Sequence, residues 1–218
     1  ILRRLDDIWC DPVELRGDSQ LGVPGLLEVI RAGNVKLANP LGCGVLENPA
    51  LLRYIDEISN FYLGRTLRLP SVKTWWLGDL GDRKYVLANV DKLIIKPVTR
   101  SARSESIYGP GLTQEHVNEL KTRILKAPGQ FVAQIATLPS AAPSWQRGQI
   151  QSLPSILRTF AVADQGSYKL MAGGLTRTAA RDDQSIVSNQ LGATSKDTWV
   201  LASEPQAQIT LRTEAANS

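Results

Sequence analysis

The most informative stretch of the sequence is Leu93-Ile94-Ile95-Lys96-Pro97, where an apolar run ends in a lysine and a proline. Such a run predicts a strand over 92–96. A lysine at the end of an apolar strand lies at a rim, where its stem packs and its ammonium group reaches an anion. The loop that follows, 99–106, is polar and basic and carries Arg100 and Arg103.

Cationic groups around this loop favour a triphosphate ligand. Guanidinium and ammonium groups neutralise the charge of phosphates and donate hydrogen bonds to their oxygens. The alternative is a strand end followed by a solvated basic loop that binds nothing. The residues of this stretch leave both interpretations open.

Apolar spacing and turn residues predict the elements on either side. On the N-terminal side we expect a helix from Pro24 to Gly33, a strand over 35–38, a loop over 39–44 and a helix from Asn48 to Gly64. The loop carries Gly42 and Gly44, which fit a structural turn better than a phosphate loop because the third glycine of a dinucleotide fingerprint is missing.

From residue 84 onward, short β-rich runs dominate. The expected strands are 84–88, 92–96, 130–135, 157–163, 168–172, 185–189 and 197–201. One helix is expected after the cap residue Thr113, and it stops at Ala127-Pro128-Gly129. Residues 139–155 are rich in proline, serine and glutamine and predict a long loop.

Composition excludes several classes of protein. The chain has 218 residues, a net charge of +4, two cysteines and one histidine. Cys10 and Cys43 form neither a disulfide framework nor a metal-binding set, which favours a reducing cytosol, and His116 alone excludes a multi-histidine zinc site. No apolar run approaches the about 20 residues of a membrane-spanning helix. No signal peptide and no Lys/Arg-rich run for nucleic acid is visible.

Two further groups of residues could carry chemistry. Arg158 and Arg177 would lie on neighbouring strands if Gly166 marks a hairpin turn, although two surface arginines on a sheet would look the same. Asn189 could supply an oxygen ligand to Mg²⁺. Lys196, followed by an acid, could bind an anion or form a surface ion pair.

Many segments, in one order, resemble the circularly permuted ATP-grasp proteins. They are Leu5-Asp6-Asp7-Ile8-Trp9-Cys10-Asp11-Pro12, Leu21-Gly22-Val23-Pro24-Gly25-Leu26, Thr74-Trp75-Trp76, Ile94-Ile95-Lys96-Pro97, Phe131-Val132-Ala133-Gln134, Gly173-Gly174-Leu175-Thr176-Arg177 and Ser195-Lys196-Asp197-Thr198-Trp199. The resemblance runs up to about Leu201. It is strongest to type 2, the branch associated with all-helical alpha-E proteins, whose relatives include glutathionylspermidine-synthase-like proteins.

The resemblance implies an α/β (α+β) fold, the C-terminal portion of an ATP-grasp with two α+β lobes. It implies a pre-ATP-grasp-like region over 1–70, a lid lobe over 71–135, a partial second lobe over 136–203 and a loose tail over 204–218. ATP-grasp enzymes use ATP and Mg²⁺ to phosphorylate a carboxylate, and an amine or thiol then attacks the acylphosphate. The expected partners are small, peptide-like carboxylates and amines and an alpha-E protein, in the cytoplasm, without nucleic acid or membrane.

The resemblance also implies roles for the residues singled out above. Lys96 would contact the α- or β-phosphate, Arg100 and Arg103 would lie in a mobile phosphate lid over 99–109, and Gln134 would face the adenine from the hinge. Arg158 and Arg177 would stabilise the transferring phosphoryl group. Lys196 would bind the nucleotide, and Asn189 would stand near the metal.

Some features depart from the family pattern. The lid loop is basic and serine-rich instead of glycine-rich, Ile135 follows the hinge where an acid is expected, and Ala193 stands where a second glycine is usual. The family's metal-binding carboxylates are expected upstream of Ile1, so we expect the chain to be part of a longer polypeptide. Two functions stay open: a ligase of which this chain is the ATP-binding portion, and an inactive nucleotide-binding or partner-docking module.

Overall fold

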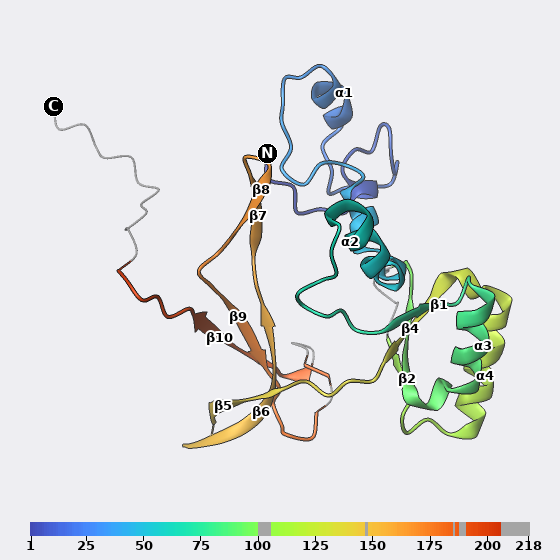
Figure 1. Cartoon of the computed structure of the whole chain (residues 1–218). Coiled ribbons are helices and arrows are strands. Elements are labelled where there is room, and N and C mark those ends of the chain that lie inside the picture. Colours follow the sequence, from blue (N-terminus) through green and yellow to red (C-terminus); the bar gives the residue numbers. More distant parts are fainter. Residues whose placement is uncertain (100–105, 147, 185, 188–190, 206–218) are drawn as a thin grey trace. The chain divides into compact units, whose positions relative to one another are not determined.

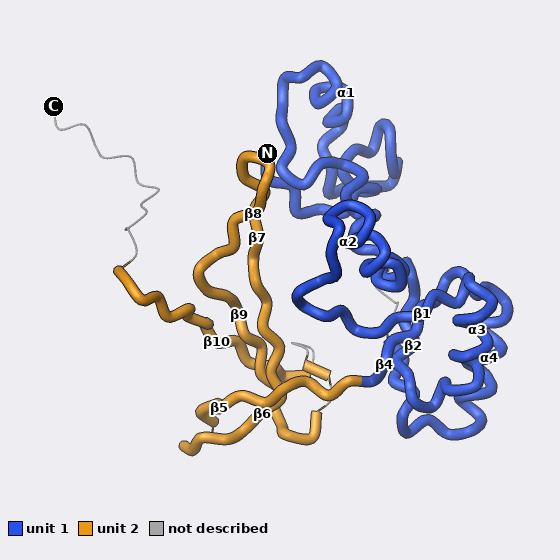
Figure 2. The backbone as a smooth tube through the Cα atoms, in the orientation of Figure 1, with its two compact units in different colours: residues 1–136 blue, residues 137–218 orange. Residues whose placement is uncertain are grey.

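A computed structural model describes residues 1–99, 106–146, 148–184, 186–187 and 191–205 of the chain (Figure 1). The chain divides into two compact units, residues 1–136 and 137–218 (Figure 2). Helices and antiparallel sheets occur together, which confirms the predicted α+β class.

Unit 1 combines short helices with a four-stranded antiparallel sheet. The helices are η1 (Asp7–Trp9), α1 (Leu26–Arg31), η2 (Cys43–Glu47), η3 (Pro49–Arg53), α2 (Ile55–Leu63), α3 (Leu80–Ala88), η4 (Val90–Lys92), α4 (Gln114–Lys126) and η5 (Pro128–Gln130). The strands are β1 (Thr74–Trp76), β2 (Leu93–Pro97), β3 (Ile107–Tyr108) and β4 (Phe131–Ile135), in the order β1-β4-β2-β3.

The core of unit 1 lies between the sheet and the helices α3 and α4, both of which contribute buried side chains to it. The buried side chains that meet there are Trp75, Leu93, Ile95 and Ala133 from the strands, Val86 from α3, and Val117, Leu120 and Ile124 from α4. The spacing of the α4 residues is helical, as predicted, and Thr113 caps α4 by accepting the His116 N–H. This packing leaves Lys96 and Gln134, which alternate with core residues along β2 and β4, on the opposite face of the sheet.

The strand expected over 84–88 is wrong, because these residues form the second half of α3. Asp79 is the N-cap of this helix, and its Oδ1 accepts the Asp82 N–H at 2.9 Å. The apolar run Tyr85-Val86-Leu87 is too short to separate a strand from a helix by its spacing. The cap six residues upstream decides in favour of the helix.

The N-terminal region confirms the predicted helices but not the predicted strand. The helix from Pro24 is α1, and the helix from Asn48 is η3 followed by α2, which ends at Gly64 in the left-handed conformation. The strand expected over 35–38 is wrong, because only Ala38 forms an isolated bridge, to Leu2.

A buried carboxylate organises the start of α1. Asp11 is fully buried, and its carboxylate accepts the N–H groups of Leu27, Gly25 and Val13 at 3.0, 3.1 and 2.9 Å. The N–H of Leu27, and then those of Val13 and Gly25, hold the pKa of Asp11 below its ordinary value against the opposing effect of burial. Asp11 therefore acts as a cap for α1 from 14 residues upstream of Gly25.

Unit 2 is built from strands. They are β5 (Ala141–Gln146), β6 (Gln149–Arg158), β7 (Ala161–Asp164), β8 (Ser167–Leu170), β9 (Gly173–Thr178) and β10 (Thr194–Trp199). One sheet has the order β10-β9-β6-β5, and β7 and β8 form a separate hairpin whose turn contains Gly166. The strand predicted over 168–172 corresponds to β8, and the strand predicted over 197–201 overlaps the end of β10.

Three other expectations for unit 2 are corrected. The long loop over 139–155 is wrong, because β5 and the first part of β6 pair there, with Pro143 on an edge strand where proline is tolerated. The single strand over 157–163 is wrong, because the chain leaves β6 after Arg158 and begins β7 at Ala161. Of the strand expected over 185–189, the described residues 186 and 187 are not in a strand, and the rest lies outside the described residues.

Candidate functional site

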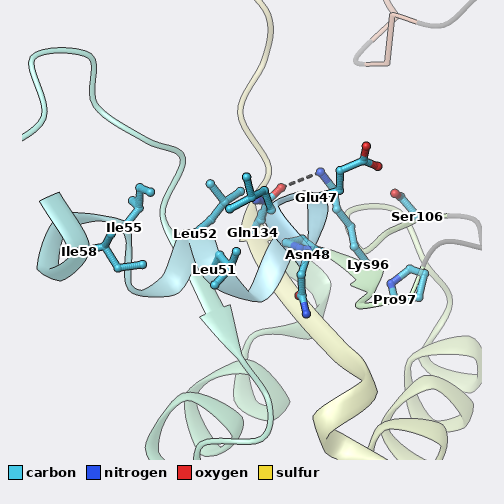
Figure 3. A pocket seen from close by; sticks show the side chains of 12 residues that line it. Glu47, Asn48, Leu51, Leu52, Ile55, Ile58, Lys96, Pro97, Ser106 and Gln134 are labelled. Carbon is cyan, nitrogen blue, oxygen red and sulfur yellow. Dashed lines mark hydrogen bonds between the residues drawn. The ribbon is translucent and has the colours of Figure 1, made fainter. Parts of the chain in front are cut away.

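A pocket of about 440 Å³ opens in unit 1 on the face of the sheet that α3 and α4 leave uncovered (Figure 3). The wall formed by η2, η3 and α2 is mostly apolar but includes Glu47 and Asn48, and the sheet contributes Lys96, Pro97 and Gln134. The lining residues are Leu46, Leu51, Leu52, Ile55, Ile58, Pro49 and Pro97, and the polar Glu47, Asn48, Lys96, Ser106 and Gln134. A volume of this size suits a small ligand.

Strand register brings the polar residues together. Ile94 lies opposite Gln134, and Lys96 lies opposite Val132, so Lys96 and Gln134 are diagonal neighbours on one face of the sheet. Thr74 on β1 lies opposite Gln134 on its other side. Three adjacent strands therefore present Thr74, Gln134 and Lys96 in a row.

These side chains form a continuous hydrogen-bonded row. Lys96 Nζ donates to Gln134 Oε1 at 2.6 Å, and Gln134 Nε2 donates to Thr74 Oγ1 at 3.0 Å. The Thr74 hydroxyl in turn donates to the carbonyl of Val72 at 2.8 Å. Gln134 and Thr74 are each only 6% exposed, so the row is held in a largely buried setting.

An ion pair fastens the apolar wall to the rest of unit 1. Arg53, the last residue of η3, donates from Nε to Asp82 Oδ2 at 2.7 Å, and the same oxygen accepts the Trp76 N–H at 3.0 Å. The hydrogen bond to Asp82 raises the pKa of the Arg53 guanidinium. This contact connects η3 to α3 and β1, and so holds Leu51 and Leu52 at the pocket, where Figure 3 shows them beside Gln134.

The pocket can accept a ligand with two chemically different ends. Leu51, Leu52 and Ile55 offer an apolar surface on which a flat heteroaromatic ring can lie. The Lys96 ammonium group offers charge-assisted hydrogen bonds to an anion. A nucleotide has both parts, a base and a phosphate chain, in one molecule.

The structure agrees with the predicted position of Lys96 but gives the Gln134 side chain a different set of contacts from the one predicted. Lys96 lies at the pocket, on the strand that the sequence predicted. Gln134 also lines the pocket, but both ends of its amide are bonded, to Lys96 and to Thr74. The side chain of Gln134 therefore binds the Lys96 ammonium group and is not available to bind a base.

The loop over 39–44 is a structural turn, as expected. The Gly42 N–H donates to Asp7 Oδ2 at 2.9 Å, and Asp7 also pairs with Arg3 at 2.8 Å. A carboxylate of the chain itself thus occupies the N–H that a phosphate loop would offer to a ligand. Gly42 has a φ of 91°, which explains the glycine.

In unit 2, Arg158 and Arg177 lie on neighbouring strands and on the same face. Arg177 on β9 is opposite Ile156 on β6, and Arg158 is opposite Leu175, so the two arginines are diagonal neighbours. Within the described residues neither arginine forms an ion pair with a carboxylate. The sequence prediction that they lie on adjacent strands is confirmed.

Arg177 carries an unsatisfied donor. Its Nε is buried and has no hydrogen-bond partner among the residues that the structure describes. A buried N–H of a charged group without an acceptor is costly, so such a group is usually satisfied by a ligand, an ion or water. Arg158, by contrast, is exposed.

Lys196 lies on the other face of the same sheet. It is opposite Thr176, one position away from Arg177, and side chains alternate between faces along a strand. Its Nζ donates to the carbonyl of Pro143 at 2.8 Å and to Ser144 Oγ at 2.9 Å. These bonds connect β10 to β5, so Lys196 has a structural role. Arg158 and Arg177 lie on the opposite face of the sheet.

Three predicted site residues, Arg100, Arg103 and Asn189, lie outside the described residues. In the described ranges, no three or more His, Cys, Asp or Glu side chains gather where they could hold a metal ion. The helices of the described ranges are all too short or too polar to cross a membrane.

Sequence reasoning missed Thr74 and the apolar wall. Thr74 is an ordinary strand residue by its sequence, and only the register of β1 against β4 places it beside Gln134. The helix expected from Asn48 to Gly64 includes Leu51, Leu52 and Ile55, but their role as a pocket wall depends on where η3 lies on the sheet. Helical spacing identifies a buried face without saying what it covers.

Unit 1 thus combines an antiparallel sheet, two helices on one face and a lysine-bearing pocket on the other. In a comparison with known families, the family described as circularly permuted ATP-grasp type 2 matches residues 1–179. The chain belongs to the circularly permuted ATP-grasp family, type 2, as the sequence predicted.

The relatives that it matches are longer proteins. Uncharacterized protein Rv2567 of Mycobacterium tuberculosis is 36% identical over 204 residues, which cover 94% of this chain and 22% of the relative. Uncharacterized protein Rv2411c of the same organism is 36% identical over 214 residues, 97% of this chain and 38% of the relative. Uncharacterized protein sll0335 of Synechocystis is 34% identical over 206 residues, which cover 94% of this chain and 43% of the relative. The chain thus spans less than half the length of each.

Proposed function

We propose that this chain is the ATP-binding portion of a ligase that joins a carboxylate to an amine or a thiol through an acylphosphate. The observation that carries the proposal is the pocket of unit 1, where an apolar wall stands beside the ammonium group of Lys96. Family membership supports it, because the ATP-grasp fold generally binds ATP with Mg²⁺. The base would lie on the wall of Leu51 and Leu52, and the phosphates would lie at Lys96.

The proposed reaction has two steps. A carboxylate oxygen attacks the γ-phosphorus of ATP, the bond to ADP breaks, and an acylphosphate forms. The nitrogen of a neutral amine, or the sulfur of a thiol, then attacks the acyl carbon, inorganic phosphate leaves, and a proton is released. Both steps develop negative charge on phosphoryl oxygens, which cationic side chains stabilise.

The chain's own cations are assigned to that charge. Lys96 binds the phosphates of ATP, together with Arg100 and Arg103 in the loop that follows β2. Arg158 and Arg177 stabilise the transferring phosphoryl group, and the buried, unpartnered Nε of Arg177 supports this role because it requires an acceptor. Lys196 is the weakest of the proposed nucleotide contacts, since its ammonium group already binds Pro143 and Ser144.

Magnesium enters the proposal as the counter-ion of ATP, with Asn189 as its proposed contact. The described residues supply no cluster of acidic, histidine or cysteine side chains that would fit a metal. No step of the reaction is therefore assigned to a metal held by these residues. We propose a cytoplasmic location, small peptide-like substrates and an alpha-E partner only for the whole protein.

The second candidate is an inactive nucleotide-binding or docking module. It is favoured by Ile135, which directly follows Gln134 where the family pattern has an acid and which is 46% exposed. The isoleucine side chain has no polar atom with which to bind a ribose hydroxyl or a cation. This module would bind Mg-ATP and release no ADP.

Trapping of the acylphosphate separates the two candidates. The full-length protein is incubated with Mg-ATP, a mixture of carboxylic acids and hydroxylamine, which converts an acylphosphate into a stable hydroxamate. A ligase gives hydroxamate and ADP in equal amounts, and Arg177→Met abolishes both. Nucleotide binding without either product would favour the inactive module, and absence of binding would contradict both candidates.

A further inference from the structure

The orientation of the Gln134 amide follows from its two neighbours. The Lys96 ammonium group has donors only, so the atom of Gln134 that faces it must be the carbonyl oxygen, Oε1. Nε2 then faces Thr74 Oγ1, which must accept. This is consistent only if the single hydroxyl proton of Thr74 goes elsewhere, and it goes to the carbonyl of Val72.

The row of bonds therefore has one direction, from Lys96 through Gln134 and Thr74 to the backbone. With Gln134 and Thr74 each 6% exposed, water has little access to replace a lost partner. Reversing the amide would place its NH₂ against the ammonium group, so that two donors face each other. At the far end of the row, the Thr74 hydroxyl could donate to a reversed Gln134 oxygen only by giving up its bond to the Val72 carbonyl, so Thr74 favours the observed orientation.

We infer that Thr74 is a positioning residue, which fixes the Gln134 amide so that its oxygen holds the Lys96 ammonium group at the pocket. The inference rests on the proposed binding of ATP phosphates by Lys96. A lysine side chain has several rotatable bonds, and a fixed acceptor reduces the freedom that it loses when it binds an anion. Thr74 itself does not line this pocket.

The test compares Mg-ATP binding by the full-length wild-type protein and by Thr74→Val, which keeps the shape of the side chain and removes the acceptor. We expect about ten-fold weaker binding, which corresponds to about 1.4 kcal/mol. Thr74→Ser restores the hydroxyl and should bind as the wild type does. Thr122→Val is the matched control, because Thr122 is exposed on α4 and its hydroxyl donates to the backbone carbonyl of Asn118 in the same helix.

A second variant guards against misfolding of Thr74→Val. Gln134→Met has nearly the same length, removes both bonds and leaves no unsatisfied amide, and it should lose about as much affinity as Thr74→Val. Melting curves of all variants separate a loss of binding from a loss of folding. If Thr74→Val or a folded Gln134→Met binds as tightly as the wild type, the inference is overturned.

A spectroscopic measurement does not depend on ATP. In protein labelled with ¹⁵N-glutamine, the side-chain NH₂ of Gln134 is identified by its loss in Gln134→Met, and its exchange with water is measured. Slow exchange in the wild type and in Thr74→Ser, with faster exchange in Thr74→Val, supports the inference. Fast exchange in the wild type would overturn the inference even if ATP binds. If exchange is slow but the wild type does not bind Mg-ATP, only the proposed function is refuted.

Discussion

Gly109→Ala is predicted to destabilise unit 1 because two backbone carbonyls occupy the space that a methyl group would need. A Cβ atom at this position would lie 1.9 Å from the carbonyl oxygen of Val90 and 2.5 Å from that of Leu93. Neither atom belongs to a side chain that could rotate away. The Gly109 N–H also donates to the Leu93 carbonyl at 2.9 Å, so relief of the clash breaks this bond.

The magnitude follows from these two terms. Forcing a methyl group into a filled site costs about 1–3 kcal/mol. Loss of the hydrogen bond adds about 1 kcal/mol. The sum of about 2–4 kcal/mol corresponds to a melting temperature lowered by roughly 10 °C for a unit of this size.

Thermal and urea unfolding of Gly109→Ala and the wild type provide the assay, with Gly129→Ala as the control. At Gly129 the nearest atom to an added Cβ is Trp76 Cζ2 at 3.9 Å, which is an ordinary contact, so this variant should unfold like the wild type. Equal melting of Gly109→Ala and Gly129→Ala would refute the close approach of the Gly109 backbone to η4 and β2.

Three further predictions concern other parts of the chain. Arg177→Met should leave the melting temperature unchanged or raised, because it removes a buried donor without a partner among the described residues. ATP turnover should fall at least about 100-fold. A variant that loses stability but keeps turnover would contradict this prediction. The pKa of Asp11 is lowered by folding, so its contribution to stability is present above an unfolded pKa of about 3.9 and is lost as pH falls through the lower folded pKa. Urea unfolding between about pH 5 and pH 2 should therefore weaken more steeply with acid in the wild type than in Asp11→Asn, and parallel curves would argue against the cap. Asp82→Asn weakens the ion pair with Arg53 that holds η3, so Mg-ATP titration should show several-fold weaker binding, whereas unchanged affinity would mean that the pocket wall does not need this contact.

Local patterns predicted the elements whose sequence signals agree with one another. For α4, the cap at Thr113 and the spacing of Val117, Leu120 and Ile124 indicate the same helix. For β2, the run of three large aliphatic residues indicates a strand, and the lysine at its end was placed at a rim. In these cases local propensity, apolar spacing and turn residues point to one structure.

Predictions failed where composition and pairing disagree. The residues of β5 and β6 are rich in proline, serine and glutamine, yet they pair from Ala141 to Gln146, because an edge strand tolerates Pro143. β9 begins with Gly173 and Gly174, although glycine is depleted in strands. A side chain at either position would meet a backbone oxygen, that of Thr198 at 2.9 Å or that of Arg158 at 2.6 Å.

The candidate site was predicted only at the level of single residues. Lys96 and Gln134 were singled out, but their contact depends on the register of β2 against β4, which no local pattern specifies. The separation of Lys196 from Arg177 onto opposite faces likewise follows from register. Residue type identifies candidates, and strand pairing decides which of them can act together.

Calorimetric titration of the full-length protein with Mg-ATP tests the central claim most directly, using the wild type, Lys96→Met and the control Lys84→Met. Lys84 is an exposed residue of α3. Loss of a charge-assisted contact of about 1.5–3 kcal/mol predicts that Lys96→Met binds about 10- to 150-fold more weakly, while Lys84→Met binds like the wild type. Equal affinity of Lys96→Met and the wild type would contradict the assignment of this pocket to the phosphates of ATP.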